Sequence, residues 1–343
     1  MRPPPDLSDD RLIETLRITY GLSIAALHFL PIGYDPKAFV FRATATGGVD
    51  WFVKVRIGAF SEAGLRVPAL LAESGVPHLL PPRPALSGAL FGTVDDLSVA
   101  VYPYIHGENA MKRGLSEEQW RTFGRTLRAI HDGGFADRLR GQLPEETFSL
   151  PNAPSVRHLS EKGRTAMATG PAATAFARFW DDHAARIDEL RTRAEALGRI
   201  LRSRRWELVL CHADIHAANL LIDENENLYL IDWDAPLLAP RERDFLFVVG
   251  SQIARRVTPR EESRFFDGYG ETSIDRAALT YFRYERILED IGEIAPRVLG
   301  DPNQDETARQ AEADLLRGFF APGGSVESAI AGDPGGWSGS GFV

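Results

Sequence analysis

After one amphipathic segment, the chain places apolar residues in short strand-like runs up to about residue 104 and at helical spacing beyond it. The first segment, residues 8–20, predicts a helix that begins at the N-cap Ser8 and stops at Gly21. A second helix is predicted at 61–74. The strands are predicted at 24–32, 38–43, 49–55, 84–91 and 97–104. This order predicts a small lobe with five strands and one inserted helix.

The second part of the chain has a helical pattern. Residues 116–119 form a capping-box sequence, after which apolar residues recur every three or four positions. Further helices are predicted at 174–204, 241–254, 260–267, 275–295 and 305–320. We therefore expect an N-terminal lobe over 1–103 and a C-terminal lobe over 104–322. The remaining residues, 323–343, are rich in Gly, Ser and Pro, which predicts a disordered tail.

One stretch, CHADIHAANLLIDENENLYLIDWD at residues 211–234, carries the most distinctive polar pattern of the chain. An apolar strand at 207–210 leads into it, and two short apolar runs flank the turn-rich residues 223–227. A hairpin is therefore predicted, and its return strand brings Asp232 back beside Asn219.

This arrangement suits phosphoryl transfer from ATP with Mg²⁺ as cofactor. Asp214 is positioned as the catalytic carboxylate that accepts the proton of an attacking hydroxyl. Asn219 and Asp232 supply hard oxygen ligands, which Mg²⁺ prefers together with phosphate oxygens and water. We therefore expect Asn219 and Asp232 to bind both the metal and, through it, the nucleotide.

The segments HADIHAANLL and LIDWD resemble the signature of the aminoglycoside phosphotransferase family, whose members are small-molecule kinases. The resemblance implies an α+β, two-lobed, protein-kinase-like fold with a five-stranded antiparallel sheet in the nucleotide-binding lobe and a larger, mainly helical catalytic and substrate-binding lobe. Ala213 stands where protein kinases carry an Arg, and no APE segment follows, so the usual phosphorylation switch is missing. A small-molecule substrate is therefore expected.

Four further segments, YPYIHGENA, APRERD, FFDGYGE and ERILED, resemble the spectinomycin kinases of that family. Three of these segments, APRERD, FFDGYGE and ERILED, lie outside the chemistry that all members share. The resemblance therefore implies an O-phosphotransferase that acts on a hydroxyl of spectinomycin or a related aminocyclitol or aminoglycoside, with a role in antibiotic inactivation or self-protection.

The same resemblance assigns the nucleotide site. Lys54 lies inside the apolar strand WFVKV and is expected to hold the nucleotide phosphates, with Glu62 as its helix partner and Glu73 as a rival. Tyr104 and Ile105 follow the last predicted strand and should form the hinge, whose backbone reads the adenine edge. The loop at 31–38 contains neither GxGxxG nor a Walker sequence, which excludes a Walker-type nucleotide site.

Several carboxylates are candidates for binding an amine-bearing substrate. Glu285 and Glu289 are separated by four positions, so they share one face of the predicted helix. The expected substrate site comprises the catalytic carboxylate and four others, namely Asp214, Asp234, Glu285, Glu289 and Asp290. The alternative is a surface network in which Arg283 and Arg286 neutralise the helix carboxylates.

Three other functions remain open from the residues alone. A metabolic kinase for choline, homoserine or a sugar amine would share the same motif. The HADIH sequence also resembles metallohydrolase clusters, in which His212 and His216 would bind zinc or a metal pair. A nucleotide-binding pseudokinase is a third alternative, although the intact set of Lys54, Asp214, Asn219 and Asp232 argues against it.

Composition narrows the cellular setting. The 343 residues include 44% hydrophobic and 25% charged ones, which is ordinary for globular proteins, and the net charge of −9 argues against non-specific nucleic-acid binding. A single cysteine, Cys211, excludes an intrachain disulfide. No basic segment followed by an apolar stretch opens the sequence, and no apolar run is long enough to span a bilayer. We expect a cytoplasmic protein, while its oligomeric state stays open.

Overall fold

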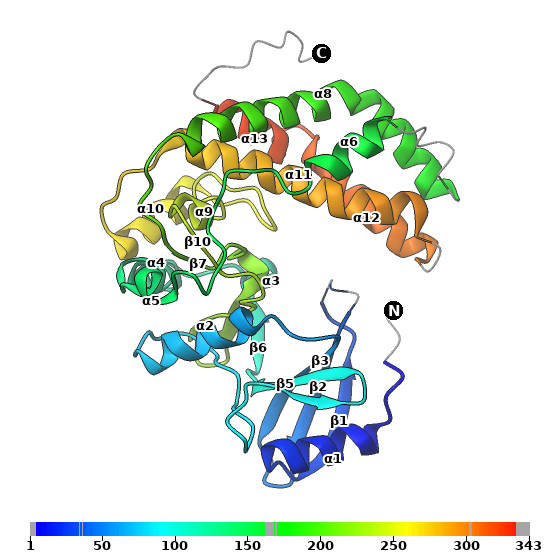
Figure 1. Ribbon diagram of the computed structural model, residues 1–343, viewed down its shortest axis with the longest axis vertical. Helices are drawn as coiled ribbons and strands as arrows, with labels where there is room; N and C mark the ends of the chain where they lie inside the picture. Colours follow the sequence, from blue (N-terminus) through cyan, green and yellow to red (C-terminus); the bar gives the residue numbers. More distant parts are fainter. Residues whose placement is uncertain are drawn as a thin grey trace. The chain divides into compact units, whose positions relative to one another are not determined.

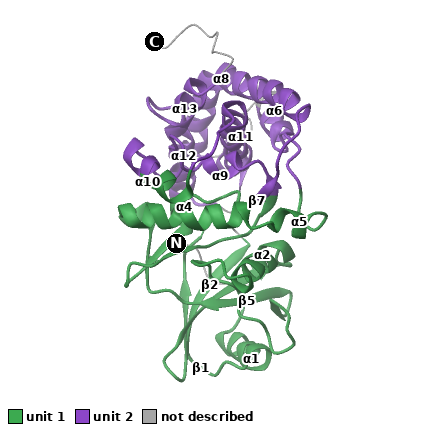
Figure 2. Ribbon diagram, turned by 90° about the vertical axis from the view of Figure 1, so that its left-hand side faces the viewer, with its two compact units in different colours: residues 1–144, 212–237, 264–270 green, residues 145–211, 238–263, 271–343 purple. Residues whose placement is uncertain are grey.

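The computed structural model describes residues 5–33, 35, 37–161, 168, 170–301 and 304–333. The chain forms two compact units, which Figure 2 shows in different colours. Unit 1 comprises residues 1–144, 212–237 and 264–270, and unit 2 comprises residues 145–211, 238–263 and 271–343. Unit 1 is larger than the lobe expected over 1–103, because it also includes residues 104–144, the catalytic hairpin within 212–237, and residues 264–270. The division into lobes at residue 103 stays a prediction.

Unit 1 is built on a five-stranded sheet (Figure 1). Its strands are β1 (Ile24–Leu30), β2 (Ala38–Ala45), β3 (Asp50–Ile57), β4 (Gly92–Val94) and β5 (Leu97–Pro103). They lie in the order β1-β2-β3-β5-β4, and all neighbouring strands are antiparallel. In the central register, Lys54 of β3 lies between Val40 and Ala100. The expected five-stranded antiparallel sheet is confirmed.

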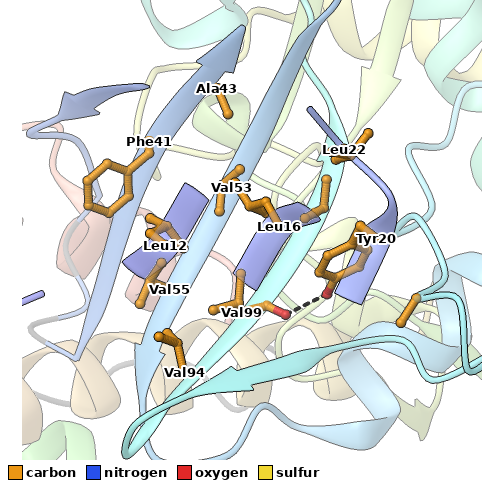
Figure 3. Packing of buried hydrophobic residues seen from close by; sticks show 12 residues of the cluster. Leu12, Leu16, Tyr20, Leu22, Phe41, Ala43, Val53, Val55, Val94 and Val99 are labelled. Carbon is orange, nitrogen blue, oxygen red and sulfur yellow. Dashed lines mark hydrogen bonds between the residues drawn. The ribbon is translucent and has the colours of Figure 1, made fainter. Parts of the chain in front are cut away.

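Helix α1 (Asp9–Tyr20) covers one face of this sheet. Ser8 accepts a hydrogen bond from the backbone N–H of Arg11, as an N-cap does, and Gly21 ends the helix with a left-handed φ of 68°. Leu12, Leu16 and Tyr20 are fully buried against strand residues such as Val53 and Val55 (Figure 3). Because strand residues alternate between the two faces, Lys54 points to the opposite face.

The remaining elements of unit 1 include α2 (Glu62–Glu73), β6 (Gly107–Asn109), α3 (Ala110–Arg113), α4 (Glu117–Asp132) and α5 (Phe135–Leu139). The short helix η1 (Ala217–Asn219) leads into the hairpin of β8 (Leu220–Asp223) and β9 (Leu228–Leu230), which pairs with β6 in a second sheet. The predicted capping box at Ser116 and the predicted hairpin are both confirmed.

Unit 2 is mainly helical. Its elements are α6 (Ala153–Glu161), α8 (Pro171–Arg202), β7 (Val209–Cys211), β10 (Leu237–Ala239), α9 (Glu242–Phe245), α11 (Arg276–Gly300), α12 (Glu306–Phe319) and α13 (Ser325–Ala331), and α10 (Pro259–Tyr269) contributes residues to both units. Helix α11 is central, because α6, α8, α9, α12 and α13 all pack against it. Within the described ranges, none of the helices combines the length and the apolar composition that a membrane span requires.

Three predicted elements differ from the structure. The segment 84–91 is not a strand, because Gly88, with a φ of 85°, closes a turn in which its N–H bonds the Ala85 carbonyl. The helix expected at 241–254 is reduced to α9. The tail expected to be disordered instead forms α13 at its start, because Val326, Ala329 and Ile330 provide a buried apolar face. Residues 334–343 of that tail lie outside the described part.

Candidate active site

The loop that precedes η1 is held by His212, which is buried. Its Nε2 lies 2.9 Å from the carbonyl oxygen of Ile231, and its Nδ1 lies 3.3 Å from the backbone nitrogen of Asp214. A carbonyl only accepts and a backbone N–H only donates, so Nε2 carries the proton and Nδ1 is the acceptor. Both nitrogens of His212 are therefore engaged, and this histidine cannot serve as the zinc ligand that the metallohydrolase alternative requires.

Asp214 lies between His212 and η1, and its carboxylate is partly exposed. His216 faces this carboxylate, with its Nε2 3.6 Å from Oδ2 of Asp214. His216 also caps η1, because its Nδ1 accepts from the N–H of Ala218 at 3.2 Å. His216 therefore orients the loop beside the carboxylate, a positioning role that sequence reasoning missed because the HADIH spacing had suggested only metal ligation.

Asn219 and Asp232 are brought together by the hairpin. The N–H of Ile231 donates to the carbonyl oxygen of Asn219 at 3.0 Å, which places the next residue, Asp232, beside Asn219. The Asn219 side chain donates through Nδ2 to the carbonyl oxygen of Asp214 at 2.8 Å. With its nitrogen used in this way, the amide keeps its oxygen as an acceptor.

This donor set fits a magnesium ion. Asn219 offers an amide oxygen and Asp232 a carboxylate, both hard ligands. Asp232 also has a φ of 66°, a left-handed conformation that is uncommon for residues other than glycine and is typical of functional sites when the surrounding structure enforces it. The pair therefore meets the chemical requirement for holding a metal against nucleotide phosphates.

Lys54 contacts two carboxylates at the end of the same hairpin. Its Nζ lies 3.2 Å from Oδ1 of Asp232, and 3.0 and 2.8 Å from the two oxygens of Asp234. Burial of Lys54 opposes its charge, but the two carboxylates outweigh this effect and raise the pKa of the ammonium. Burial also opposes the charge of Asp232, but Lys54 lowers its pKa, whereas burial and the Asp232 charge together raise the pKa of Asp234.

The prediction that Glu62 is the partner of Lys54 was wrong. Glu62 is exposed in the first turn of α2, and within the described part of the chain the ion pairs of Lys54 are those with Asp232 and Asp234. The rival Glu73 ends the same helix and is also exposed. The carboxylate that sequence reasoning assigned to the substrate, Asp234, is thus the one that holds Lys54.

The hinge segment follows β5, which ends at Pro103. The N–H of Tyr104 donates to the carbonyl oxygen of Asp50 at 3.3 Å, which ties the segment to β3. Ile105 makes no hydrogen bond with another residue in the described ranges, so its backbone groups remain available to a planar base. The adenine-reading role of this segment stays a prediction.

In unit 2, Glu285 is buried and paired. Its side chain is 8% exposed, forms an ion pair with Arg243 and accepts a hydrogen bond from Tyr281 at 3.1 Å. Burial raises the pKa of Glu285 to about 7, because Arg243 opposes this shift only in part while the negative charges of Glu146 and Glu289 add to it. Glu285 is therefore a structural carboxylate and not an exposed wall for a substrate amine. A buried arginine could have been suspected from the charged sequence APRERD, because an apolar run follows it directly.

The other two carboxylates of α11 differ from each other. Asp290 pairs with Arg286, whose Nε lies 3.2 Å away. This ion pair is part of the surface network of carboxylates and arginines that was the alternative to a substrate site. Arg283 instead donates to the carbonyl oxygen of Val249. The Glu289 side chain is half-buried and makes neither a hydrogen bond nor an ion pair with another described residue, although its charge acts on Arg243. It is thus the carboxylate of this group that is best placed to accept a cationic ligand.

Comparison with known proteins identifies the family. Residues 27–282 match the model of the phosphotransferase enzyme family, APH. The chain belongs to this family. Its structure resembles that of the spectinomycin phosphotransferase APH(9)-Ia in complex with ADP and spectinomycin, with a TM-score of 0.84 and 31% identity over 96% of this chain and 99% of the other. Protein StrN of Streptomyces griseus is 25% identical over 288 residues, 82% of each chain.

Family membership settles the fold and the general activity. The mixed helix-and-strand, protein-kinase-like fold is confirmed, and the chain is a small-molecule phosphotransferase. The same fold occurs in a choline kinase from Streptococcus pneumoniae, which has a TM-score of 0.54 and 14% identity over 94% of this chain and 98% of that one. Since the fold serves several acceptors, it does not by itself select one.

Proposed function

We propose that this phosphotransferase uses ATP and Mg²⁺ to phosphorylate a hydroxyl of spectinomycin or a closely related aminocyclitol, in antibiotic inactivation or self-protection. The observation that carries the proposal is the similarity over nearly the whole length of both chains to an enzyme whose structure contains ADP and spectinomycin. The 31% identity extends through both unit 1 and unit 2. It is therefore more informative about the acceptor than the catalytic motif alone, which the whole family shares.

The chemistry rests on unit 1. The substrate hydroxyl oxygen forms a bond to the γ-phosphorus of ATP, the bond between this phosphorus and the bridging β–γ oxygen breaks, and ADP leaves. Asp214 takes the hydroxyl proton on a carboxylate oxygen, in an orientation supported by His216 at 3.6 Å. Lys54 holds the phosphates, and Asn219 and Asp232 hold Mg²⁺. When bound, Mg²⁺ would neutralise the charge that the phosphates carry.

The acceptor is proposed to bind as a cation. Spectinomycin carries two protonated amines, and Glu289 is a half-buried carboxylate of α11 whose side chain makes neither a hydrogen bond nor an ion pair with another described residue. Asp290 is a secondary contact because Arg286 already neutralises part of its charge. Charge pairs that are removed from water contribute substantially to recognition but also carry a desolvation cost, so one or two such contacts are sufficient for selectivity.

We also propose that the enzyme acts in the cytoplasm, where ATP is available. The single thiol, Cys211, is buried, and burial raises its pKa, so it is kept as an unreactive thiol. Hinge contacts through the backbone of Tyr104 and Ile105 would bind the adenine.

The decisive experiment incubates the purified protein with ATP and Mg²⁺ and follows the acceptor by mass spectrometry. The panel contains spectinomycin, aminoglycosides, choline, homoserine and amino sugars, with Asp214→Asn as the inactive control. We expect spectinomycin to gain the mass of one phosphoryl group. Absence of this gain, together with rapid phosphorylation of choline, homoserine or a sugar, would overturn the proposal. Parallel reactions with GTP test the choice of nucleotide.

A further inference from the structure

Lys54 is paired with Asp234 instead of the expected carboxylate on helix α2, and this difference suggests a function for Asp234. Lys54 is 14% exposed in its side chain, so it requires a defined counter-charge. Asp234 supplies this counter-charge through both carboxylate oxygens, at 3.0 and 2.8 Å, whereas Asp232 contributes a single longer contact at 3.2 Å. A two-oxygen contact restricts the direction of the ammonium more than a single contact does.

Helix α2 supports this contact through its backbone. Gly64, in the first turn of α2, is buried, and a Cβ added there would lie 2.8 Å from the carbonyl oxygen of Trp233 and 3.3 Å from Cα of Asp234. Any side chain at this position would displace the segment that carries Asp234. The helix therefore presents a glycine, and not a carboxylate, to the residues around Lys54.

We propose that Asp234 is the positioning residue for Lys54 and takes the role that a carboxylate on helix α2 would otherwise have. In this role it holds the ammonium in the direction needed for nucleotide phosphates, and Asp232 remains available for the metal. Gly64 is also required for this contact, because the absence of a side chain there allows Trp233 and Asp234 to approach α2. The inference rests on the proposed role of Lys54 in binding the nucleotide.

The test measures the dissociation constant of ADP by calorimetry in the absence of divalent metal, so that a change in metal binding cannot account for the result. The variants are Asp234→Ala, Asp234→Asn, Lys54→Ala and the double variant of Lys54 and Asp234. Glu62→Ala tests the rival helix carboxylate. Far-UV circular dichroism and thermal unfolding confirm that each variant is folded.

We expect Asp234→Ala to weaken ADP binding about tenfold, the scale of a charged contact that acts through a second residue. Asp234→Asn should fall between this variant and the wild type, because one amide oxygen can still accept from Lys54. In the Lys54→Ala background, the Asp234 change should have no further effect. Glu62→Ala should bind ADP as the wild type does. In steady-state assays, Asp234→Ala should raise the KM for ATP and leave the KM for the acceptor nearly unchanged.

The outcomes distinguish the role of Lys54 in nucleotide binding from the role of Asp234 in positioning Lys54. If Lys54→Ala binds ADP normally, the proposed role of Lys54 in the nucleotide site fails. If Lys54→Ala is impaired but Asp234→Ala binds ADP normally or more tightly, only the positioning role of Asp234 fails. An increase in the acceptor KM alone would return Asp234 to the substrate site, and an impaired Glu62→Ala would restore the helix carboxylate. Gly64→Ala, if folded, should reproduce the defect of Asp234→Ala.

Discussion

Replacing Glu285 by Gln should change how the stability of the protein depends on pH. In the folded protein one buried arginine, Arg243, is shared by Glu285, Glu146 and Glu289, so it cannot fully stabilise all three negative charges. Burial raises the pKa of Glu285 from 4.5 to about 7, because the charge of Arg243 does not offset burial together with the repulsion from Glu146 and Glu289, and burial also raises the pKa of Glu146. The folded state therefore binds a proton at Glu285 over a pH range in which the unfolded chain has already lost it.

The direction of the effect follows from proton linkage. Between the unfolded pKa near 4.5 and the folded pKa near 7, the folded state binds more protons, so the free energy of unfolding falls as pH rises. With these two values, Glu285 accounts for a loss of about 2 kcal/mol between about pH 5.5 and about pH 8. Above the folded pKa the loss is complete and the curve flattens. Glutamine has no proton to lose, so the variant lacks this contribution.

The assay is urea unfolding of the wild type and of Glu285→Gln at about pH 5.5 and about pH 8. Taking the difference between the two proteins at each pH cancels the titration of the groups that do not interact with Glu285. We expect the wild type to lose about 2 kcal/mol more than the variant as pH rises. Glu312→Gln is the matched control, because Glu312 faces Arg297 at 3.0 Å in a more exposed pair between α11 and α12, and its double difference should be much smaller. A wild type that gains stability relative to Glu285→Gln as pH rises would refute the shared-arginine argument.

Three further predictions concern catalysis. Asp214→Asn should retain nucleotide binding and lose on the order of 10²–10⁴-fold in kcat, which calorimetry and steady-state kinetics measure; near-normal turnover would contradict its role as the base. Asp232→Ala should be inactive at any practical Mg²⁺ concentration, whereas Asn219→Ala should recover partly with high Mg²⁺ or with Mn²⁺, and recovery with Zn²⁺ alone would favour a hydrolase. Glu289→Gln should raise the KM for spectinomycin more than the KM for ATP; an unchanged acceptor KM would remove Glu289 from the substrate site.

Local patterns were sufficient to predict much of the fold. The Ser8 cap and Gly21 stop of α1, the register of alternating residues around Lys54 and the hairpin that returns Asp232 to Asn219 all depend on neighbouring residues or on a short turn. The failures occurred where a local signal was overridden. Residues 84–91 are apolar enough for a strand, but the turn at Gly88 interrupts it. The Gly-rich end of the chain still contains three apolar residues at helical spacing, which suffice to bury α13.

The site was less accessible to sequence reasoning because its decisive contacts join distant segments. Asp214, Asn219 and Asp232 lie within one motif, so their grouping could be predicted. The contact of Lys54 with Asp234 spans 180 positions. It also depends on Gly64, since a glycine in a helix carries no signal for the backbone that packs against it. The Asp-Trp-Asp spacing was visible, but nothing in it indicates which of the two carboxylates holds a lysine.

The carboxylates of α11 show why charge pattern alone cannot assign a substrate site. Their spacing indicates that Glu285 and Glu289 share a helix face, yet burial gives them different roles. Glu285 lies against Arg243 and Tyr281, where its negative charge is compensated only in part, whereas Asp290 is neutralised by Arg286 on the same helix. Glu289 forms neither kind of ion pair. Its side chain is half-buried, and its negative charge helps to raise the pKa of Arg243. The proposed binding of a cationic acceptor by this helix therefore rests on Glu289, whose side chain makes neither a hydrogen bond nor an ion pair with another described residue.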